Sequence, residues 1–210
     1  MPFKYCKAFR SYVGVWVIIL GYFDAIGQGA KVIEKAQKDV GTLEKTRNND
    51  HALFDYYRAN VSPALNKWKA PYCGCALYTW FLEAGYKPKV AAPATALSWQ
   101  RKQGVILGRN TTAAHVQKLA PGMVVLMKFS RYHVGVLKKP YPGYMVTIEG
   151  NTSNAKAVNF TPGKQDGVFE KIRPYSVAIG AYDWLHDADR YDTTQTFNLR
   201  KKFVKPQTFK

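Results

Sequence analysis

The stretch that most constrains the fold is Pro71–Gly85, with the sequence PYCGCALYTWFLEAG. From Cys73 onward its apolar residues recur at the spacing of an α-helix, and only Thr79 and Glu83 interrupt the apolar surface. A helix that is apolar on nearly all sides is covered by other parts of the protein. Gly85 supplies a residue that readily takes the left-handed conformation ending many helices. The sequence therefore predicts a buried helix against which the rest of the chain packs.

Cys73 lies at the predicted start of this helix, directly after Pro71 and Tyr72. The unpaired backbone N–H groups and the positive end of the helix dipole at such a position favour the thiolate, which is the nucleophilic form of cysteine. A free cysteine in a helix is more often an ordinary small hydrophobe, and the helix alone does not decide between the two interpretations. A catalytic thiol also needs a base and a third group that orients the base.

The composition indicates one domain of ordinary core size with terminal appendages. Of the 210 residues, 47% are hydrophobic, and 31 Lys and Arg against 14 Asp and Glu give a net charge of +17. This excess favours association with polyanions, such as nucleic acids, anionic cell-wall polymers or acidic lipid surfaces. No aromatic and basic signature of a nucleic-acid-binding module accompanies the charge, so we expect no specific nucleic-acid partner.

The cysteines predict neither a disulfide framework nor a metal site. The chain has three of them, namely Cys6, Cys73 and Cys75. Two cysteines one residue apart rarely form a disulfide because their side chains diverge. No Cys and His spacing fits a zinc site, and no loop has the Asp-rich spacing around a glycine that is typical of calcium sites. We therefore expect no cofactor and no metal.

Residues 1–30 have the pattern of a secretory signal. Three basic residues without an acid open the segment, namely Lys4, Lys7 and Arg10. The apolar run Tyr12–Phe23 follows, and small residues suited to cleavage come after it. This run is shorter than the ~20 residues needed to span a bilayer, so an uncleaved anchor is less favoured, and a buried N-terminal helix is favoured least. We expect a secreted, periplasmic or cell-envelope protein that meets the membrane only transiently, through its signal.

Helical patterns come first in the chain after the signal, and strand patterns come second. Short helices are expected at Lys31–Val40 and His51–Asn60, before the cysteine helix. Beyond residue 104 the patterns indicate strands, expected at Met123–Phe129, Tyr132–Leu137, Tyr144–Glu149, Val168–Arg173 and Ser176–Gly180. Lys139–Gly143 is expected to be a hairpin connection and Asn151–Asn154 a polar turn. The order predicts the α+β class, with N-terminal helices packed on a mostly antiparallel sheet of about five strands.

Beyond Tyr182 the sequence patterns indicate secondary structure less clearly. Asp183–Asp192 is acidic and indicates a short helix, and the basic segment Phe197–Lys210 is expected to be a mobile tail. On the short helix three potential metal ligands would share a face, namely Asp183, His186 and Asp187. Acidic residues in such a place are more often a solvated surface, so this metal site is disfavoured.

Among the four histidines, His133 has the setting expected of a catalytic base. It opens a predicted strand directly after a buried one, where a rigid element would fix the direction of its ring. The next strand ends at Glu149 and Asn151, and in an antiparallel hairpin this end returns beside the start of the strand before it. Either residue could accept a hydrogen bond from His133. A single histidine on a strand is more often structural, but a cysteine, a histidine and an acceptor in this order favour a catalytic site.

These residues resemble those of CHAP-domain cysteine amidohydrolases and peptidases, which are bacterial cell-wall hydrolases of the papain-like clan. The resemblance rests on Pro71–Gly85, Tyr132–Val136 and Ile148–Thr152, and it covers about residues 31–180. It implies a papain-like fold, with a catalytic domain at residues 31–182 and an extension with a basic tail at residues 183–210.

The resemblance also implies roles for single residues. The nucleophile of the family falls on Cys73, the base on His133, and the third polar residue on Glu149 or Asn151. Cys75 stands where the family commonly has a small residue, which leaves a choice between two thiols. Cys73 is favoured because it lies earlier in the first turn of the helix.

The function implied is that of a secreted, monomeric peptidoglycan hydrolase. It would cleave an N-acetylmuramoyl–L-alanine amide, or an amide in the peptide stem or bridge, through an acyl-enzyme. Its partner would be peptidoglycan or another anionic cell-wall polymer, which the basic surface would help to hold. The alternative is a non-catalytic module on the same fold that binds the cell wall or another polyanion.

Overall fold

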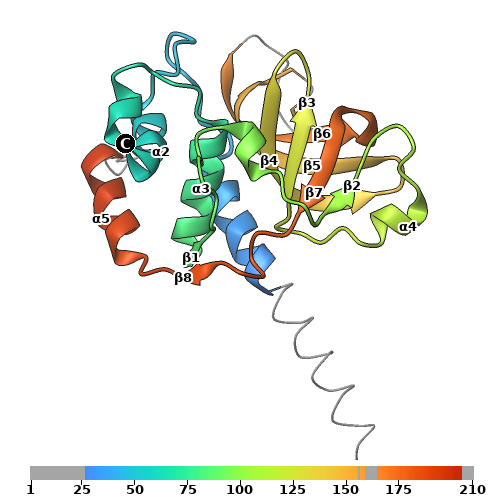
Figure 1. Cartoon of the computed structure of the whole chain (residues 1–210). Helices are drawn as coiled ribbons and strands as arrows, with labels where there is room; N and C mark the ends of the chain where they lie inside the picture. Colours follow the sequence, from blue (N-terminus) through green and yellow to red (C-terminus); the bar gives the residue numbers. More distant parts are fainter. Residues whose placement is uncertain (1–26, 156, 159–164, 205–210) are drawn as a thin grey trace, which may run out of the picture.

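A computed structural model of the chain describes residues 27–155, 157, 158 and 165–204. Helices gather on one side of the molecule and a twisted antiparallel sheet on the other, with α3 (Cys73–Glu83) between them (Figure 1). The predicted α+β class is therefore confirmed. The chain forms most of its helices before residue 100 and most of its strands after it, as the change of sequence period indicated.

The early helices follow the predicted pattern. Residues 27–39 are helical, and α2 (Ala52–Val61) begins after His51, whose ring accepts a hydrogen bond from the backbone N–H of Leu53 at 3.1 Å. Helix α3 is followed by Gly85, with a φ of 88°. Shorter helical elements connect the others: η1 (Pro63–Asn66), η2 (Ala96–Trp99), α4 (Ala113–Val116) and η3 (Tyr175–Val177).

The main sheet has six strands in the described part of the chain, one more than the five predicted. Their order is β2-β7-β3-β4-β5-β6, and every neighbouring pair is antiparallel. The strands are β2 (Val105–Ile106), β3 (Val124–Lys128), β4 (Tyr132–Tyr141), β5 (Tyr144–Ser153), β6 (Asp166–Pro174) and β7 (Ala178–Tyr182). The added strand is β2, at one edge. A separate small sheet joins β1 (Tyr86–Lys87) to β8 (Asp189–Arg190).

The β4–β5 hairpin is longer than predicted at both ends. The segment expected as a connection continues β4 through Pro140, which pairs with Met145. Pro140 is tolerated because β3 stops pairing with β4 at Val136, so that one side of β4 is an open edge where a missing N–H costs little. At the other end, β5 extends through the predicted polar turn to Ser153.

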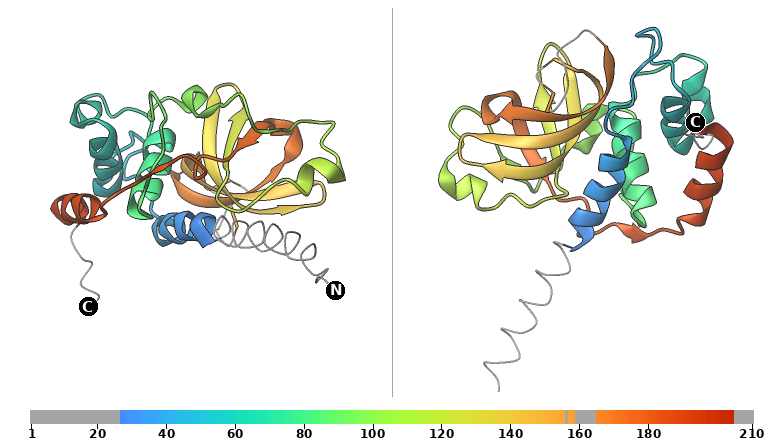
Figure 2. Two further views of the ribbon diagram at one scale, coloured as in Figure 1. Left: turned by 60° about the horizontal axis from the view of Figure 1, so that its bottom comes forward. Right: turned by 180° about the vertical axis from the view of Figure 1, so that it is seen from behind.

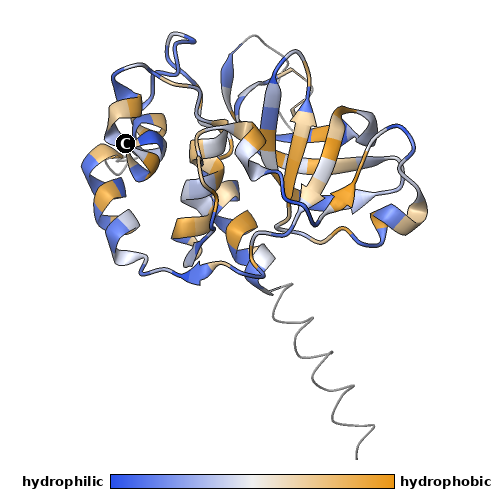
Figure 3. Cartoon of the chain, in the orientation of Figure 1, coloured by the Kyte–Doolittle hydropathy of each residue, from blue (hydrophilic) through white to orange (hydrophobic). Residues whose placement is uncertain are grey.

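The core lies where α3 packs against the sheet. All residues of α3 from Cys73 to Leu82 are buried, which confirms the burial predicted from their periodicity. Apolar residues of the helices and of the central strands β3 and β4 belong to one buried cluster. The hydropathy colouring marks many positions of these strands as hydrophobic (Figure 3). The N-terminus of α3 is thereby held rigidly against β4 and β5.

The C-terminal segment differs from the prediction. Asp183–Asp192 forms a loop with the short strand β8 instead of a helix. Residues 197–203, which were expected in a mobile tail, are part of α5 (Thr194–Phe203), which lies on the outer side of the helical layer (Figure 2). Its Arg200 reaches Asp39 at 2.5 Å and Glu83 at 2.7 Å, so the helix is fixed by charge to two earlier elements. The last six residues of the predicted tail lie outside the described residues.

The predicted signal lies mostly outside the described residues, which begin at residue 27. Residues 27–30 form the first described turn of the N-terminal helix. At Gly29 this helix approaches the backbone of Pro121 so closely that a Cβ atom would lie 2.0 Å from its carbonyl oxygen. Within the described residues, no helix is long and apolar enough to cross a membrane.

Candidate active site

Cys73, His133 and Glu149 come together where α3, β4 and β5 meet. Cys73 is the first residue of α3, and His133 lies on β4 just after the β3–β4 turn. Both side chains line a cleft of about 450 Å³, to which β5 and β6 also contribute. Cys73 is largely buried but lines the cleft, so a substrate bound there would meet this residue. The structure therefore places a cysteine and a histidine at one opening.

The imidazole of His133 lies between the thiol and the carboxylate. Its Nε2 is 3.1 Å from Oε2 of Glu149, and the ring is also close enough to the Cys73 thiol to lower the pKa of that thiol. Because Nε2 is engaged by Glu149, Nδ1 is the nitrogen left for the thiol. The three groups thus form a chain in which a proton can move from sulfur to the ring while the carboxylate fixes the ring's orientation.

Glu149 is fully buried, and three polar side chains surround its carboxylate. Thr147 donates its hydroxyl to Oε1 at 2.6 Å. Arg173 on β6 donates Nε to Oε1 at 2.8 Å and a terminal nitrogen to Oε2 at 2.6 Å. Such a two-pronged pair fixes the carboxylate in one orientation. His133 is consequently held by a group that is itself immobile.

The environment moves the pKa values of all three groups toward their charged forms. Burial alone raises the pKa of the Cys73 thiol, but the hydrogen bond and charge of His133, with backbone contacts from Val134 and Gly74, bring it below its ordinary value. Burial lowers the pKa of His133, but hydrogen bonds to Cys73 and Glu149 outweigh it and raise the pKa to about 10. Burial opposes ionisation of Glu149 too, yet Arg173 and His133 hold its pKa well below the usual range. These shifts favour a thiolate–imidazolium pair.

Asn151, the other predicted candidate for the third residue, does not contact the ring. The pairing of β5 with β6 shifts register between Gly150 and Thr152, and Asn151 at this bulge has a φ of 58°. The regular alternation that would put Glu149 and Asn151 on one side of the strand is broken there. Asn151 lines the cleft, and among the described residues no hydrogen bond joins its side chain to His133. Of the two candidates for the residue that orients His133, the geometry favours Glu149.

Cys75 lies away from the cleft and is completely buried. Burial, together with the nearby charge of Cys73, raises the pKa of the Cys75 thiol to about 12. A thiol in this state is neither accessible nor nucleophilic near neutral pH. Of the two cysteines that the sequence leaves open, only Cys73 has the surroundings of a nucleophile.

Arg173 is the site residue that the sequence analysis missed. The sequence predicts only that Arg173 is the last residue of the strand Val168–Arg173. β6 pairs with β5 so that Arg173 lies opposite Met145 and Lys171 opposite Thr147, on the side of the sheet that carries Glu149. A charged residue on the buried side of a strand could have pointed to Arg173. Placing it beside Glu149 requires knowing that β5 and β6 are neighbours.

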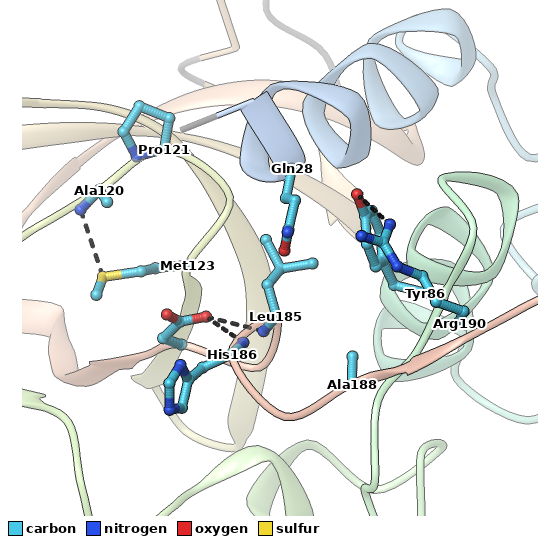
Figure 4. A pocket seen from close by; sticks show the side chains of 10 residues that line it. Gln28, Tyr86, Ala120, Pro121, Met123, Leu185, His186, Ala188 and Arg190 are labelled. Atoms are coloured by element: carbon cyan, nitrogen blue, oxygen red, sulfur yellow. Dashed lines mark hydrogen bonds between the residues drawn. The ribbon is translucent and has the colours of Figure 1, made fainter. Parts of the chain in front are cut away.

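Two of the three potential metal ligands near the C-terminus, Asp183 and Asp187, make other contacts. Asp183 accepts hydrogen bonds from the backbone N–H groups of Leu185 and His186, beside a second cavity of about 290 Å³ (Figure 4). Asp187 pairs with Arg101 at 2.7 Å. Within the described residues, no group of three His, Cys, Asp or Glu side chains is arranged to hold a metal ion.

No family model, no curated protein and no solved structure matches this chain in the comparisons made. The chemical interpretation of the cleft therefore depends on its geometry and on the resemblance of its sequence motifs.

Proposed function

We propose that this protein is a secreted cysteine-dependent amidohydrolase or peptidase with a papain-like fold, acting on bacterial peptidoglycan. The observation that carries the proposal is the position of His133, which lies between the thiol of Cys73 and the buried carboxylate of Glu149. A nucleophile at the start of a buried helix, with its base on an adjoining antiparallel sheet, is the arrangement that the CHAP-like motifs imply. A purely structural thiol would have no need of a base held by a buried ion pair.

The proposed reaction is acyl transfer through a thioester. The Cys73 thiolate attacks the amide carbonyl, a C–S bond forms, and backbone N–H groups at the start of α3 stabilise the oxyanion. When the C–N bond breaks, the His133 imidazolium gives its proton to the departing amine. The neutral ring then takes a proton from water, which attacks the thioester and releases the acid together with the thiolate. Glu149 keeps the ring in place throughout.

The choice of peptidoglycan as substrate rests on the motif resemblance and is supported by charge. A net charge of +17 attracts anionic surfaces, and bacterial walls carry carboxylates and often phosphates. The bond cleaved would be the N-acetylmuramoyl–L-alanine amide or an amide of the stem or bridge. Mass spectrometry of the digested wall identifies the bond, because each cleavage exposes a new amino group at a defined place.

The two cysteines provide a matched test of the mechanism. Cys73→Ala removes the nucleophile, and we expect no clearing band on a zymogram that contains peptidoglycan and no released muropeptides. Cys75→Ala changes a buried thiol of the same helix, and we expect it to retain activity. Clearing by Cys73→Ala would disprove the assigned nucleophile. Wall binding without hydrolysis by the wild type would instead support the non-catalytic binding module.

A further inference from the structure

The charges of the cleft are balanced except at one residue. In the active form the thiolate and the Glu149 carboxylate are offset by the imidazolium of His133 and the guanidinium of Arg173. Arg131 also lines the cleft, on the turn between β3 and β4, and it is exposed. It forms no ion pair with any described residue, and no Asp or Glu is among the residues that line this cleft. Arg131 therefore gives the opening a net positive charge.

The turn that carries Arg131 is fixed to the catalytic groups. The backbone N–H of Phe129 donates to the carbonyl of Arg131 at 3.0 Å, which closes the turn. The ring of Phe129 packs 4.9 Å from the guanidinium carbon of Arg173 and 6.2 Å from the centre of the His133 ring. Arg131 is two residues from His133 in the chain, so its backbone position relative to the base is set by the same strand.

We propose that Arg131 determines the specificity of the cleavage by binding a carboxylate of the substrate next to the scissile amide. The inference rests on the proposed function, since it concerns the substrate of the same cleft. A guanidinium presents a planar set of donors that matches a carboxylate, and in a cleft without acids no protein group competes for it. Arg173 is less suited to this role because its positive charge is already paired with the Glu149 carboxylate through two hydrogen bonds.

A substrate pair that differs only in charge tests this assignment. Two synthetic muramyl tetrapeptides are compared, one with the stem glutamate carboxyl free and one with it converted to the carboxamide. We expect wild-type kcat/KM to favour the free acid by about two- to fivefold, the size expected for one charge pair that is open to water. High salt should reduce this preference, because an exposed pair is screened.

Three substitutions separate a local effect from a change of overall charge. Arg131→Gln should abolish the preference for the free acid, and Arg131→Lys should keep part of it. Arg109→Gln removes an exposed positive charge outside the cleft and should keep the whole preference. Equal preference in wild type and Arg131→Gln would overturn the assignment, as would a wild type that does not distinguish the two peptides.

Binding to the Cys73→Ala variant, measured by calorimetry, keeps the test independent of hydrolysis. A lower Kd for the free acid, lost in the Cys73→Ala, Arg131→Gln double variant, supports the role of Arg131 even if the wild type cleaves neither peptide. Absence of cleavage would then count against the proposed function alone. Equal Kd values for the two peptides, or no binding of either, would refute the role of Arg131.

Discussion

At the scale of single residues, Glu149 acts together with Cys73 to keep His133 protonated. Its hydrogen bond and charge help to raise the pKa of His133 to about 10, so the imidazolium persists well above neutral pH. The thiol of Cys73 ionises below its ordinary pKa because this imidazolium is beside it. The reactive pair therefore exists between the two pKa values, and kcat/KM is expected to fall on the alkaline side as pH approaches 10.

Replacing Glu149 by Gln should narrow the pH range in which Cys73 and His133 form the thiolate–imidazolium pair. A neutral amide no longer stabilises the imidazolium, so the pKa of His133 falls and the alkaline limb of the pH profile moves to lower pH. We also expect kcat/KM to drop by about a hundredfold or more, the usual contribution of a positioned acid–base group.

The NMR chemical shifts of the His133 ring, followed against pH, report the same change in the pKa of His133 without a substrate. Asn151→Ala serves as the control, because Asn151 lies in the cleft but does not hydrogen-bond the ring, and it should leave the profile unchanged. An alkaline limb that stays in place in Glu149→Gln would contradict the role given to this carboxylate.

Local sequence patterns singled out Cys73 and His133 as candidates, and the structure brings the two together, but the sequence left the third residue open. Helical periodicity placed Cys73, and strand alternation placed His133. Both patterns extend over only a few neighbouring residues. The choice between Glu149 and Asn151 depended on a bulge against β6, and Arg173 depended on which strands are neighbours. Neither fact can be derived from spacing within one strand.

At the scale of elements, the β4–β5 hairpin makes room for the buried carboxylate at Gly135. This glycine lies two residues beyond His133, on the same side of β4. A Cβ atom there would lie 2.7 Å from Cγ of Glu149 and 2.9 Å from the carbonyl oxygen of Ile148. Real Cβ atoms are not found this close to other heavy atoms, so a side chain at this position must displace Glu149 or separate the two strands.

Gly135→Ala should therefore impair catalysis more than folding. We expect kcat/KM to fall by at least about tenfold, because a displacement of roughly 1 Å in a positioning group can cost up to about a hundredfold. Gly143→Ala, in the turn of the same hairpin, is the control. Nothing lies within 4 Å of a Cβ there, but the φ of 83° makes alanine costly, so it should lower the free energy of unfolding while kcat/KM is retained. Equal kcat/KM values for the two variants would show that Gly135 does not position Glu149.

At the scale of the whole molecule, the order of the sequence patterns was enough to predict the α+β class. It was not enough to predict the structure of the C-terminal segment. The segment around α5 is rich in Lys and Arg, and such composition alone is typical of a solvated tail. Its ordering depends on Arg200, whose partners Asp39 and Glu83 are 161 and 117 residues away in the chain. Pairing over such separations leaves no periodic trace in the sequence. Deleting residues 197–210 would therefore remove a packed helix and would not test binding of polyanions by a free tail.

Arg200→Ala should destabilise the whole helical layer. Asp39 is 1% exposed and also accepts hydrogen bonds from Tyr57 and Trp80, so it would remain buried with no cation beside it. Breaking a buried ion pair costs about 3–5 kcal/mol, and we expect roughly 2–3 kcal/mol here because Arg200 is partly exposed. Urea unfolding of this variant beside Lys202→Ala, which removes an exposed charge from the same helix, measures the difference.

The decrease in the free energy of unfolding caused by Arg200→Ala should also depend on pH. Burial already raises the pKa of Glu83, and Arg200 opposes that rise. Without Arg200 the pKa rises further above its unfolded value, and a carboxyl in this state destabilises the fold more as pH increases. The difference in unfolding free energy from the wild type should consequently be larger at pH 8 than at pH 5. A difference that does not vary with pH would mean that α5 is held by the apolar contacts of Leu199 and Phe203 and not by its ion pairs.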